Sequence, residues 1–426
     1  MAKIAGYLKK FYHWEYFGLT IIFLTTLIFH AVIINNASST IFDEYHYVTD
    51  GRQIIAGEGS LRTEHPPLGK LFIVWGMQIF GDGPIGWRIF AVTASQVSII
   101  LFYFISRRIG LSSRTSVMAV AILAFENLSF VQGGIGMLDV FSVTFGFLAL
   151  WLYLRGDWPL AGLAVGLSAL AKLNGALFIL AIGLHWLLTG YKKPVRFIGS
   201  MLVAPISFVA LFPVFNYFIF HQWRDPVEDI RMMLSGTGAL TFTDYPQEIA
   251  SYPWEWIALP KAITYYSDPR YVGMISPTLW ALIIPSIGYI IYKCLKGDNA
   301  ALLPFSWFTT LYLFWIPATL VTDRVTYVFY FYPAVGSVAL ALAIGLDDLA
   351  ELSFSSSAKR RLLGLLPPFF FLLHMIAFII LVPIPLYCSI PLSLLVVCYL
   401  FCLYLPPRSE EAGKVPALIS EISGSP

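Results

Sequence analysis

Long apolar runs separated by short polar segments make up most of this chain. Runs of about twenty residues recur along it, the length that a helix needs to cross the hydrocarbon core of a bilayer. We therefore predict membrane spans at 15–35, 86–106, 115–131, 137–154, 158–172, 174–189, 197–220, 276–293, 302–321, 327–346, 363–383 and 387–405. Since the short runs between 115 and 189 can merge, the pattern predicts an all-α integral membrane protein with about 11 or 12 transmembrane helices.

Basic residues indicate the orientation of these spans. Lys and Arg accumulate in cytoplasmic loops of membrane proteins. With the N-terminus cytoplasmic, the basic clusters all fall on one side: Arg107, Arg108, Arg114, Arg155, Lys192, Lys193, Arg196, Lys293, Lys296, Lys359, Arg360, Arg361 and Arg408. Two sizeable loops, 36–85 and 221–275, are then predicted on the opposite, non-cytoplasmic side.

Composition excludes several classes of function. Hydrophobic residues make up 58% of the chain and charged residues 12%, and the net charge is +2, so nothing points to a nucleic-acid partner. The four cysteines have no metal-ligating neighbours, and the sequence has neither a Gly-rich phosphate loop nor a zinc-binding pair of histidines. We therefore expect no metal and no soluble cofactor. If the protein is a transferase, it would therefore need a donor that is already activated within the bilayer.

The first outer loop concentrates polar chemistry. Asp43 and Glu44 follow the first span directly, and His46, His65 and Lys70 lie in the same loop. Near the low-dielectric edge of the bilayer a carboxylate can acquire the raised pKa that suits a general base, although paired carboxylates also serve simply to solvate an interface. Adjacent side chains point in different directions, so only one of the two is expected to be the base. Farther along this loop, Pro66 and Pro67 predict the start of an interfacial helix over 68–80.

Two further acids interrupt apolar runs at membrane depth. Glu126 ends one run and Asp139 opens the next, with glycines between them. Acids at this depth are costly and so are candidates for function. The alternative for Asp139 is that it caps the N-terminus of its own helix.

Cations form the third group of candidates. Arg88 and Arg324 are predicted at the outer ends of spans, where their planar forks can bind the oxygens of a lipid phosphate. Lys172 interrupts an apolar run and must either pair with an acid or reach the interface. Contact with lipid headgroups or a structural ion pair is the alternative for each cation.

Several motifs together resemble the protein O-mannosyltransferase family. They occur in the family's order over about residues 40–345: Phe42-Asp43-Glu44, His65-Pro66-Pro67-Leu68-Gly69-Lys70, Trp87-Arg88, Phe125-Glu126-Asn127, Leu138-Asp139, Ala171-Lys172-Leu173-Asn174-Gly175, Ser251-Tyr252-Pro253-Trp254-Glu255-Trp256, and Arg324 before Tyr330-Phe331-Tyr332-Pro333. The His-Pro-Pro-Leu-Gly-Lys and Ser-x-Pro-Trp-x-Trp segments are specific only in combination.

The resemblance implies a GT-C membrane glycosyltransferase that moves mannose, with inversion, from a polyprenyl (dolichyl) phosphate to Ser or Thr of a protein. Its partners would be the polyprenyl-phosphate-linked sugar, an acceptor protein or peptide, and membrane lipids. By motif, Asp43 is the catalytic acid, with Glu44 beside it. Arg88 and Arg324, together with Lys70 and Lys172, are expected at the donor phosphate. The remaining residues are expected to shape the acceptor site: His46, His65, Glu126, Asp139 and Trp254.

The chain also departs from the family's pattern. The segment 221–275 is too short for the large lumenal sugar-binding domain of the eukaryotic enzymes, and Tyr330-Phe331-Tyr332 replaces Tyr-His-Tyr. Both departures indicate a compact prokaryotic relative in a plasma membrane. A lipid or glycan acceptor remains the alternative, and a transporter or flippase is disfavoured because the polar residues cluster near one face.

The predicted organisation has three parts. A GT-C catalytic module covers 1–346, C-terminal transmembrane helices cover 347–405, and a disordered cytoplasmic tail covers 406–426.

Overall fold

The computed structural model describes residues 16–244, 248–352 and 362–403. Apolar helices occupy every predicted span. Their bounds are α2 Phe17–Ile33, α5 Pro84–Arg108, α6 Ser113–Ala124, α7 Asn127–Gly133, α8 Leu138–Arg155, α9 Trp158–Ala171, η1 Leu173–Leu177, α10 Phe178–Leu188, α11 Pro194–Met201, α12 Val203–Phe220, α15 Pro277–Trp280, α16 Ile283–Leu295, η2 Asn299–Ala301, α17 Leu302–Leu311, α18 Trp315–Thr322, η3 Val328–Phe331, α19 Tyr332–Glu351, α21 Leu366–Leu381 and α22 Leu386–Cys402. The predicted tail, 406–426, lies outside the described residues.

Not all of these helices are long enough to span a bilayer by themselves. Among the described residues five helices are long and apolar enough, or six if α6 and α7, which meet at a bend of 66°, form one broken span. Seven more apolar helices have 10–17 residues, and all but one of these, Pro67–Phe80, lie within predicted spans. The chain is therefore an integral membrane protein built of helices, as the apolar pattern predicted.

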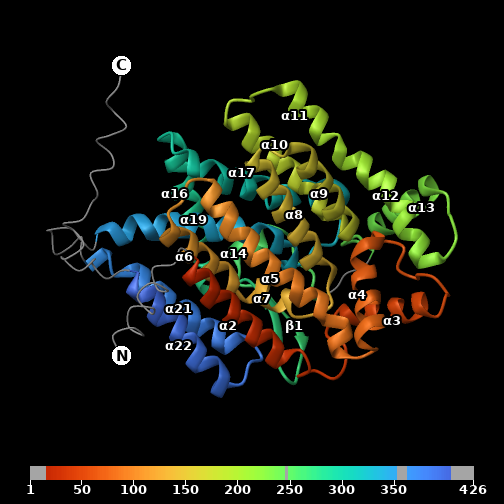
Figure 1. Ribbon diagram of the computed structural model, residues 1–426, viewed down its shortest axis with the longest axis horizontal. Coiled ribbons are helices and arrows are strands. Elements are labelled where there is room, and N and C mark those ends of the chain that lie inside the picture. The colour runs from red at the N-terminus through yellow and green to blue at the C-terminus, as the bar shows by residue number, and fades with distance from the viewer. Residues whose placement is uncertain (1–15, 245–247, 353–361, 404–426) are drawn as a thin grey trace, which may run out of the picture.

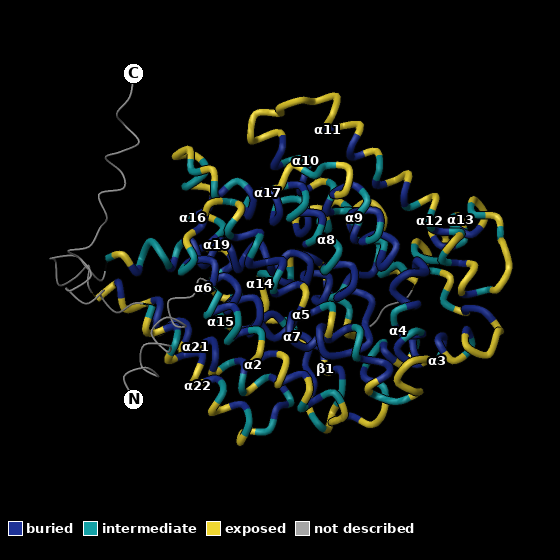
Figure 2. The backbone as a smooth tube through the Cα atoms, in the orientation of Figure 1, coloured by how far each residue is buried: buried dark blue, intermediate teal, exposed yellow. Residues whose placement is uncertain are grey.

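Burial separates the centre of the helix bundle from its lipid-facing edge. α19 is the central helix: 94% of its most apolar window is buried, and it packs against α6, α17 and α16. The long helix over Pro194–Phe220 is only 33% buried although it is the more hydrophobic of the two. Figure 2 shows this contrast as dark blue in the middle of the molecule and much yellow along α11 and α12. Exposed apolar side chains on α12 are the surface that lipid tails would cover.

The predicted outer loops fold into short helices and one hairpin. The first loop forms α3 (Glu44–Ile55) and α4 (Pro67–Phe80), and α4 begins at Pro67 as predicted. The second forms α13 (Pro226–Gly238), α14 (Glu255–Ala258) and an antiparallel hairpin of β1 (Ala262–Tyr266) and β2 (Tyr271–Met274), in which Ile263 pairs with Gly273. The all-α prediction therefore holds apart from this one hairpin. α3, α4 and α13 lie together at the right of Figure 1.

Candidate active site

The chain turns sharply between α2 and α3, and this turn positions Asp43. Phe42 adopts a left-handed backbone conformation (φ 52°), and Asp43 is the residue that precedes α3. The ring of Phe42 stacks on Tyr265 of β1, with ring centroids 4.4 Å apart and an interplanar angle of 13°. Tyr265 is held in turn by a hydrogen bond from Gln132 Nε2 of α7 to its hydroxyl, 2.9 Å. An unfavourable backbone conformation is thus stabilised by aromatic packing at the position beside the candidate base.

Asp43 is half-buried and lies among charged groups from three other segments. Burial raises its pKa from 3.8 to about 6, and the negative charge of Asp139 acts in the same direction. The positive charges of Lys172 and Arg62 oppose that rise. A carboxylate with this pKa is mostly ionised at neutral pH, yet it is more basic than an ordinary Asp, which suits a general base.

Glu44 has a very different environment, since it forms a sealed ion pair with Arg88. The Glu44 carboxylate accepts hydrogen bonds from Arg88 Nε and Nη2 at 3.0 and 2.8 Å, and from the backbone N–H groups of Ile41 and Gly136. Both side chains of the pair are at most 1% exposed. Glu44 therefore has no free oxygen directed at a substrate or at His46.

The remaining Arg88 donors go to the backbone that leaves α2. Nη1 donates to the carbonyls of Ile34 and Ala37, both at 2.8 Å, and Nη2 donates to Ser39 at 2.9 Å. All five N–H donors of the guanidinium are thus directed at protein oxygens. The expectation that Arg88 binds the donor phosphate does not fit this arrangement. Its geometry instead fixes the turn that carries Asp43.

Asp139 and Lys172 form a second buried pair, which acts electrostatically on Asp43. Lys172 Nζ donates to both carboxylate oxygens of Asp139, at 2.8 and 2.7 Å, and lies over the rings of Phe329 and Tyr330 at 5.4 and 5.3 Å. The alternative that Asp139 caps α8 is wrong, because Met137 holds that position and no side chain caps this helix.

Gly69 of the His-Pro-Pro-Leu-Gly-Lys motif packs against the residue before Lys172. A Cβ on Gly69 would lie 2.4 Å from the backbone oxygen of Ala171. The motif glycine therefore allows α4 to approach the end of α9 closely, and this contact fixes the position of Lys172 relative to the first outer loop.

A cavity of about 400 Å³ opens beside these groups. Its polar lining comes from four segments: Glu64, His65, Lys172, Asn174, Thr237, Thr322, Arg324 and Tyr330. Leu173, Leu177, Leu234, Leu240, Phe314 and Trp315 supply apolar lining. The cavity thus combines two cations with an apolar wall, a combination that fits the phosphate and the first isoprene units of a polyprenyl phosphate.

Two lining residues still have capacity to bind a ligand. Arg324 is partly exposed, and within the described residues its guanidinium makes one long hydrogen bond, from Nη1 to the carbonyl of Leu240 at 3.3 Å. The side-chain oxygen of Asn174 is buried and accepts no hydrogen bond within the described part of the chain. The sequence places Asn174 within a motif but indicates no role for it. Its position on the cavity wall is the observation that indicates one.

The other polar residues of the first loop hold that loop together. Lys70 Nζ donates to Ser60 Oγ and to the carbonyl of Arg62, both at 2.7 Å, and lies 3.5 Å from Asp50. Lys70 is 3% exposed and has no donor left for a phosphate, contrary to the prediction. His46 Nδ1 lies 2.7 Å from Arg62.

His65 reaches the cavity. Its Nε2 lies 3.4 Å from the hydroxyl of Tyr47. Burial lowers its pKa well below 6.5, and the charges of Lys172 and Lys70 add to this effect. The imidazole is therefore neutral at pH 7 and available for hydrogen bonding.

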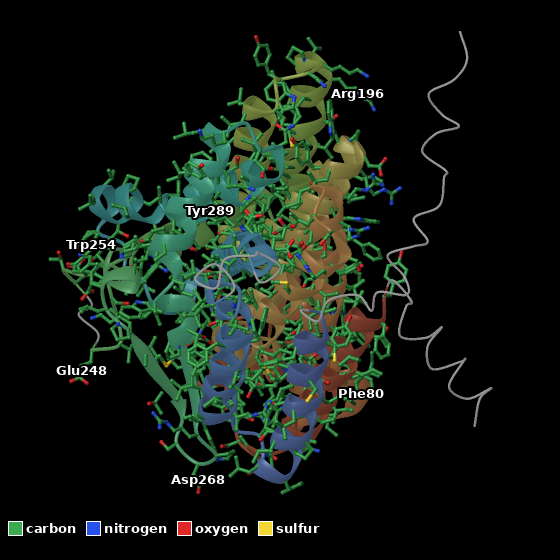
Figure 3. All side chains as sticks on the ribbon, turned by 90° about the vertical axis from the view of Figure 1, so that its left-hand side faces the viewer. Phe80, Arg196, Glu248, Trp254, Asp268 and Tyr289 are labelled. Atoms are coloured by element: carbon green, nitrogen blue, oxygen red, sulfur yellow. The ribbon has the colours of Figure 1, made fainter. Side chains whose placement is uncertain are left out.

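Glu126 and Trp254 lie away from the cavity lining. Glu126 accepts hydrogen bonds from the backbone N–H of Ser129, at 2.7 Å, and of Ser276, at 2.8 Å. It caps α7 and ties α7 to the segment after the hairpin. Trp254 is 39% exposed and stacks on Tyr252 with centroids 4.6 Å apart. Figure 3 places Trp254 at the edge of the molecule, and neither residue lines the cavity.

Comparisons with known proteins identify relatives of this chain. A model of the dolichyl-phosphate-mannose-protein mannosyltransferase family matches residues 64–238. Polyprenol-phosphate-mannose–protein mannosyltransferases from Mycolicibacterium smegmatis and Corynebacterium glutamicum are 24% and 21% identical over 437 and 410 residues. The alignments cover 79% and 74% of this chain, and 82% and 78% of the relatives.

Solved structures show the same fold. The yeast (S. cerevisiae) protein O-mannosyltransferase Pmt1-Pmt2 complex, bound to its sugar donor, superposes with a TM-score of 0.65 at 12% identity, covering 96% of this chain and 95% of that one. ArnT from Cupriavidus metallidurans, bound to undecaprenyl phosphate, superposes with a TM-score of 0.52 at 16% identity, covering 91% and 75%. The predicted resemblance to the protein O-mannosyltransferases and the GT-C fold are both confirmed.

Proposed function

We propose that this protein is a membrane glycosyltransferase that moves a sugar, most simply mannose, from a polyprenyl phosphate to a Ser or Thr hydroxyl of a protein. One observation carries the proposal. A half-buried carboxylate with a raised pKa, Asp43, lies within the electrostatic influence of Lys172, and Lys172 lines a cavity together with Arg324 and an apolar wall. The names of the matched relatives supply the donor and acceptor classes.

Asp43 acts as the general base in this reaction. Its carboxylate takes the proton from the acceptor hydroxyl while the oxygen attacks the anomeric carbon of the sugar. The bond between that carbon and the phosphate oxygen breaks on the opposite face, so the configuration inverts and polyprenyl phosphate leaves. Lys172 and Arg324 face the negative charge that develops on the phosphate, and cations placed there lower the barrier.

The other residues position these groups. Glu44 and Arg88 hold the turn that presents Asp43, and Asp139 fixes Lys172. The neutral His65 and the unpaired oxygen of Asn174 are available to hydrogen-bond hydroxyl groups of the sugar or acceptor. Among the described residues, no group of three or more His, Cys, Asp or Glu could hold a metal ion.

A lipid acceptor is the second candidate. An undecaprenyl phosphate-alpha-4-amino-4-deoxy-L-arabinose arabinosyl transferase from Pseudomonas aeruginosa is 30% identical over 164 residues, which cover 34% of this chain. That alignment has the higher identity but the smaller coverage, so we favour a protein acceptor.

The reaction would take place on the non-cytoplasmic side of a prokaryotic plasma membrane. The basic clusters support this orientation, because the outer loops lie opposite to them. Leu61 is 73% exposed in the first loop, Thr243 is exposed in the second, and Leu295 is 82% exposed at the basic end. In a cysteine-free background, single cysteines at Leu61 and Thr243 should react with an impermeant reagent in intact cells. A cysteine at Leu295 should react only after lysis, and the reverse pattern would invert the orientation.

Purified protein incubated with a panel of polyprenyl-phosphate sugars and acceptors tests the function. Mass spectrometry should show a hexose added to a Ser- or Thr-containing peptide and an equal amount of released polyprenyl phosphate. Transfer to a lipid A-type acceptor, with none to peptides, would select the second candidate. Solute movement without consumption of any lipid-linked sugar would refute both.

A further inference from the structure

Two rings on α3 are the helical neighbours of Asp43. The backbone of Asp43 has helical angles (φ −64°, ψ −13°), and residues three and four positions apart on a helix are neighbours. These positions hold His46 and Tyr47, and the backbone N–H of His46 donates to the carbonyl of Asp43 at 2.9 Å. Tyr47 is 3% exposed, whereas His46 is partly exposed. Asp43 thus has one buried and one accessible ring beside it.

The buried ring belongs to the donor side of the site. The hydroxyl of Tyr47 lies 3.4 Å from Nε2 of His65, which lines the cavity that we assign to the donor. His46 and Arg62 do not line that cavity. In a single displacement the acceptor attacks the face of the sugar opposite the departing phosphate. The acceptor therefore reaches Asp43 from outside the donor cavity, where His46 is the accessible neighbour; α3 lies at the edge of the molecule (Figure 1).

Arg62 determines which nitrogen of His46 carries the proton. Arg62 Nη2 lies 2.7 Å from His46 Nδ1, and a guanidinium has only donors, so Nδ1 accepts this hydrogen bond. Burial lowers the pKa of His46, and the charge of Arg62 adds to this effect while Glu64 opposes it. The imidazole is therefore neutral at pH 7, and its one proton lies on Nε2. Within the described residues Nε2 makes no hydrogen bond, so this donor is unused.

Arg62 is itself held at its backbone by buried groups. Its N–H donates to Asp50 Oδ1 at 3.3 Å, and its carbonyl accepts from Lys70 Nζ at 2.7 Å. Asp50 and Lys70 are only 2% and 3% exposed. The side chain of Arg62 is 41% exposed, and its Nη1 lies 3.5 Å from Glu64. A buried anchor thus carries a surface arginine, and this arginine fixes the orientation of His46.

We propose that His46 binds the acceptor. Its Nε2–H donates a hydrogen bond to a backbone carbonyl oxygen of the acceptor segment, next to the Ser or Thr that receives the sugar, and Arg62 is the positioning residue that orients the imidazole. A hydrogen bond donated to the attacking hydroxyl would engage its lone pair and oppose the attack, so the carbonyl is the productive partner. This inference rests on the function proposed above, and it adds a contact that recognises a peptide acceptor.

Steady-state kinetics of the purified full-length chain test the inference, with a polyprenyl-phosphate sugar as donor and a Ser- or Thr-containing peptide as acceptor. His46→Phe keeps a ring but removes the donor, so KM for the peptide should rise about tenfold, the order expected for one lost hydrogen bond. KM for the lipid donor should not change. His46→Gln should restore most of the peptide affinity, because its amide N–H groups can replace the Nε2–H donor.

Arg62 provides an independent variant and Arg52 its matched control. Arg62→Met should raise KM for the peptide because the imidazole is no longer oriented, and Arg62→Lys, which still donates to Nδ1, should raise it less. Arg52 lies on the same helix and pairs with Asp82 instead, so Arg52→Met should leave KM for the peptide unchanged.

The wild-type protein separates this inference from the proposed function. If the wild type transfers sugar to the peptide and both His46→Phe and Arg62→Met keep its KM for the peptide, the inference is overturned while the function stands. An equal rise in KM for the donor would show a structural role and would also overturn the inference. If the wild type transfers sugar to no peptide, the proposed function is wrong, and His46 has no peptide to bind.

Discussion

Asp43 and Glu44 are neighbours in sequence but occupy opposite kinds of environment. Glu44 is fully buried, and its carboxylate is saturated by Arg88 and two backbone N–H groups. Asp43 is half-buried, has a raised pKa and lies near Lys172 on the cavity wall. The comparison shows that two adjacent carboxylates can have different roles. Glu44 stabilises the local structure, and Asp43 remains available for chemistry.

Loss of the base should have the largest effect. Asp43→Asn keeps the shape of the side chain but removes its ability to accept a proton, and general-base catalysis typically contributes about a hundred- to ten-thousand-fold. Turnover of lipid-linked sugar should fall by that factor, while thermal stability and donor binding remain close to wild type. Glu58→Gln, at an exposed position in the same loop, is the control. Near wild-type turnover in Asp43→Asn would remove it from this role.

Breaking the sealed pair should act on stability rather than on chemistry. Removing one partner of a buried ion pair leaves the other charged and unpaired, at a cost of about 3–5 kcal/mol. Glu44→Gln should therefore lower the melting temperature and the yield of folded protein. Arg88→Lys should lower both as well, because Lys keeps the charge but cannot replace all the hydrogen bonds of the guanidinium. A double variant should lose less than the sum of the two single losses. If Glu44→Gln left stability unchanged and abolished turnover, the two carboxylates would have to exchange roles.

Arg324 extends the comparison to the cations, because it lines the cavity whereas Arg88 lies in a buried ion pair. Arg324→Lys keeps the charge but loses the bidentate fork, so we expect about tenfold weaker donor binding with no change in melting temperature. Arg88→Lys should show the converse pattern. Arg231→Lys on exposed α13 is the control. Full donor affinity in Arg324→Lys would place the phosphate elsewhere.

Near neutral pH, the pH dependence should be the mildest of these effects. With a pKa of about 6, Asp43 is protonated and inactive as a base below that value and ionised above it. kcat/KM should therefore rise about tenfold per pH unit up to pH 6 and level off above pH 7. The measurement is donor consumption at subsaturating donor between pH 4.5 and 8. A flat profile over this range would mean that Asp43 does not act as the base.

Most of the fold could be predicted from the sequence, because the length and spacing of the apolar runs determine where helices cross a membrane. The helices match the predicted spans, and Pro67 begins α4. The hairpin was not predicted, because its strands have only five and four residues, too few to give a clear strand pattern in the sequence. Short strands of this kind depend on tertiary packing, here on α7.

The candidate site was predicted only in part. The sequence indicated which segments meet at the cavity, but it did not show which side chains already have hydrogen-bond or ion-pair partners. Sequence motifs brought the correct segments together, since His65, Lys172 and Arg324 all line one cavity. They could not show which cations were already saturated, because the partners of Arg88 include backbone carbonyls that carry no sequence signal. For the same reason the free oxygen of Asn174 becomes evident only in three dimensions.

The stacking of Phe42 on Tyr265 has a consequence for how the protein is made. Asp43 leaves the ribosome early, but the ring that supports its turn follows more than two hundred residues later, and the aromatic residues around Lys172 come later still. During membrane insertion the growing chain therefore carries the Asp43 carboxylate without the surroundings that raise its pKa. The proposed catalytic arrangement can therefore form only when the segment near residue 330 has been inserted and packed.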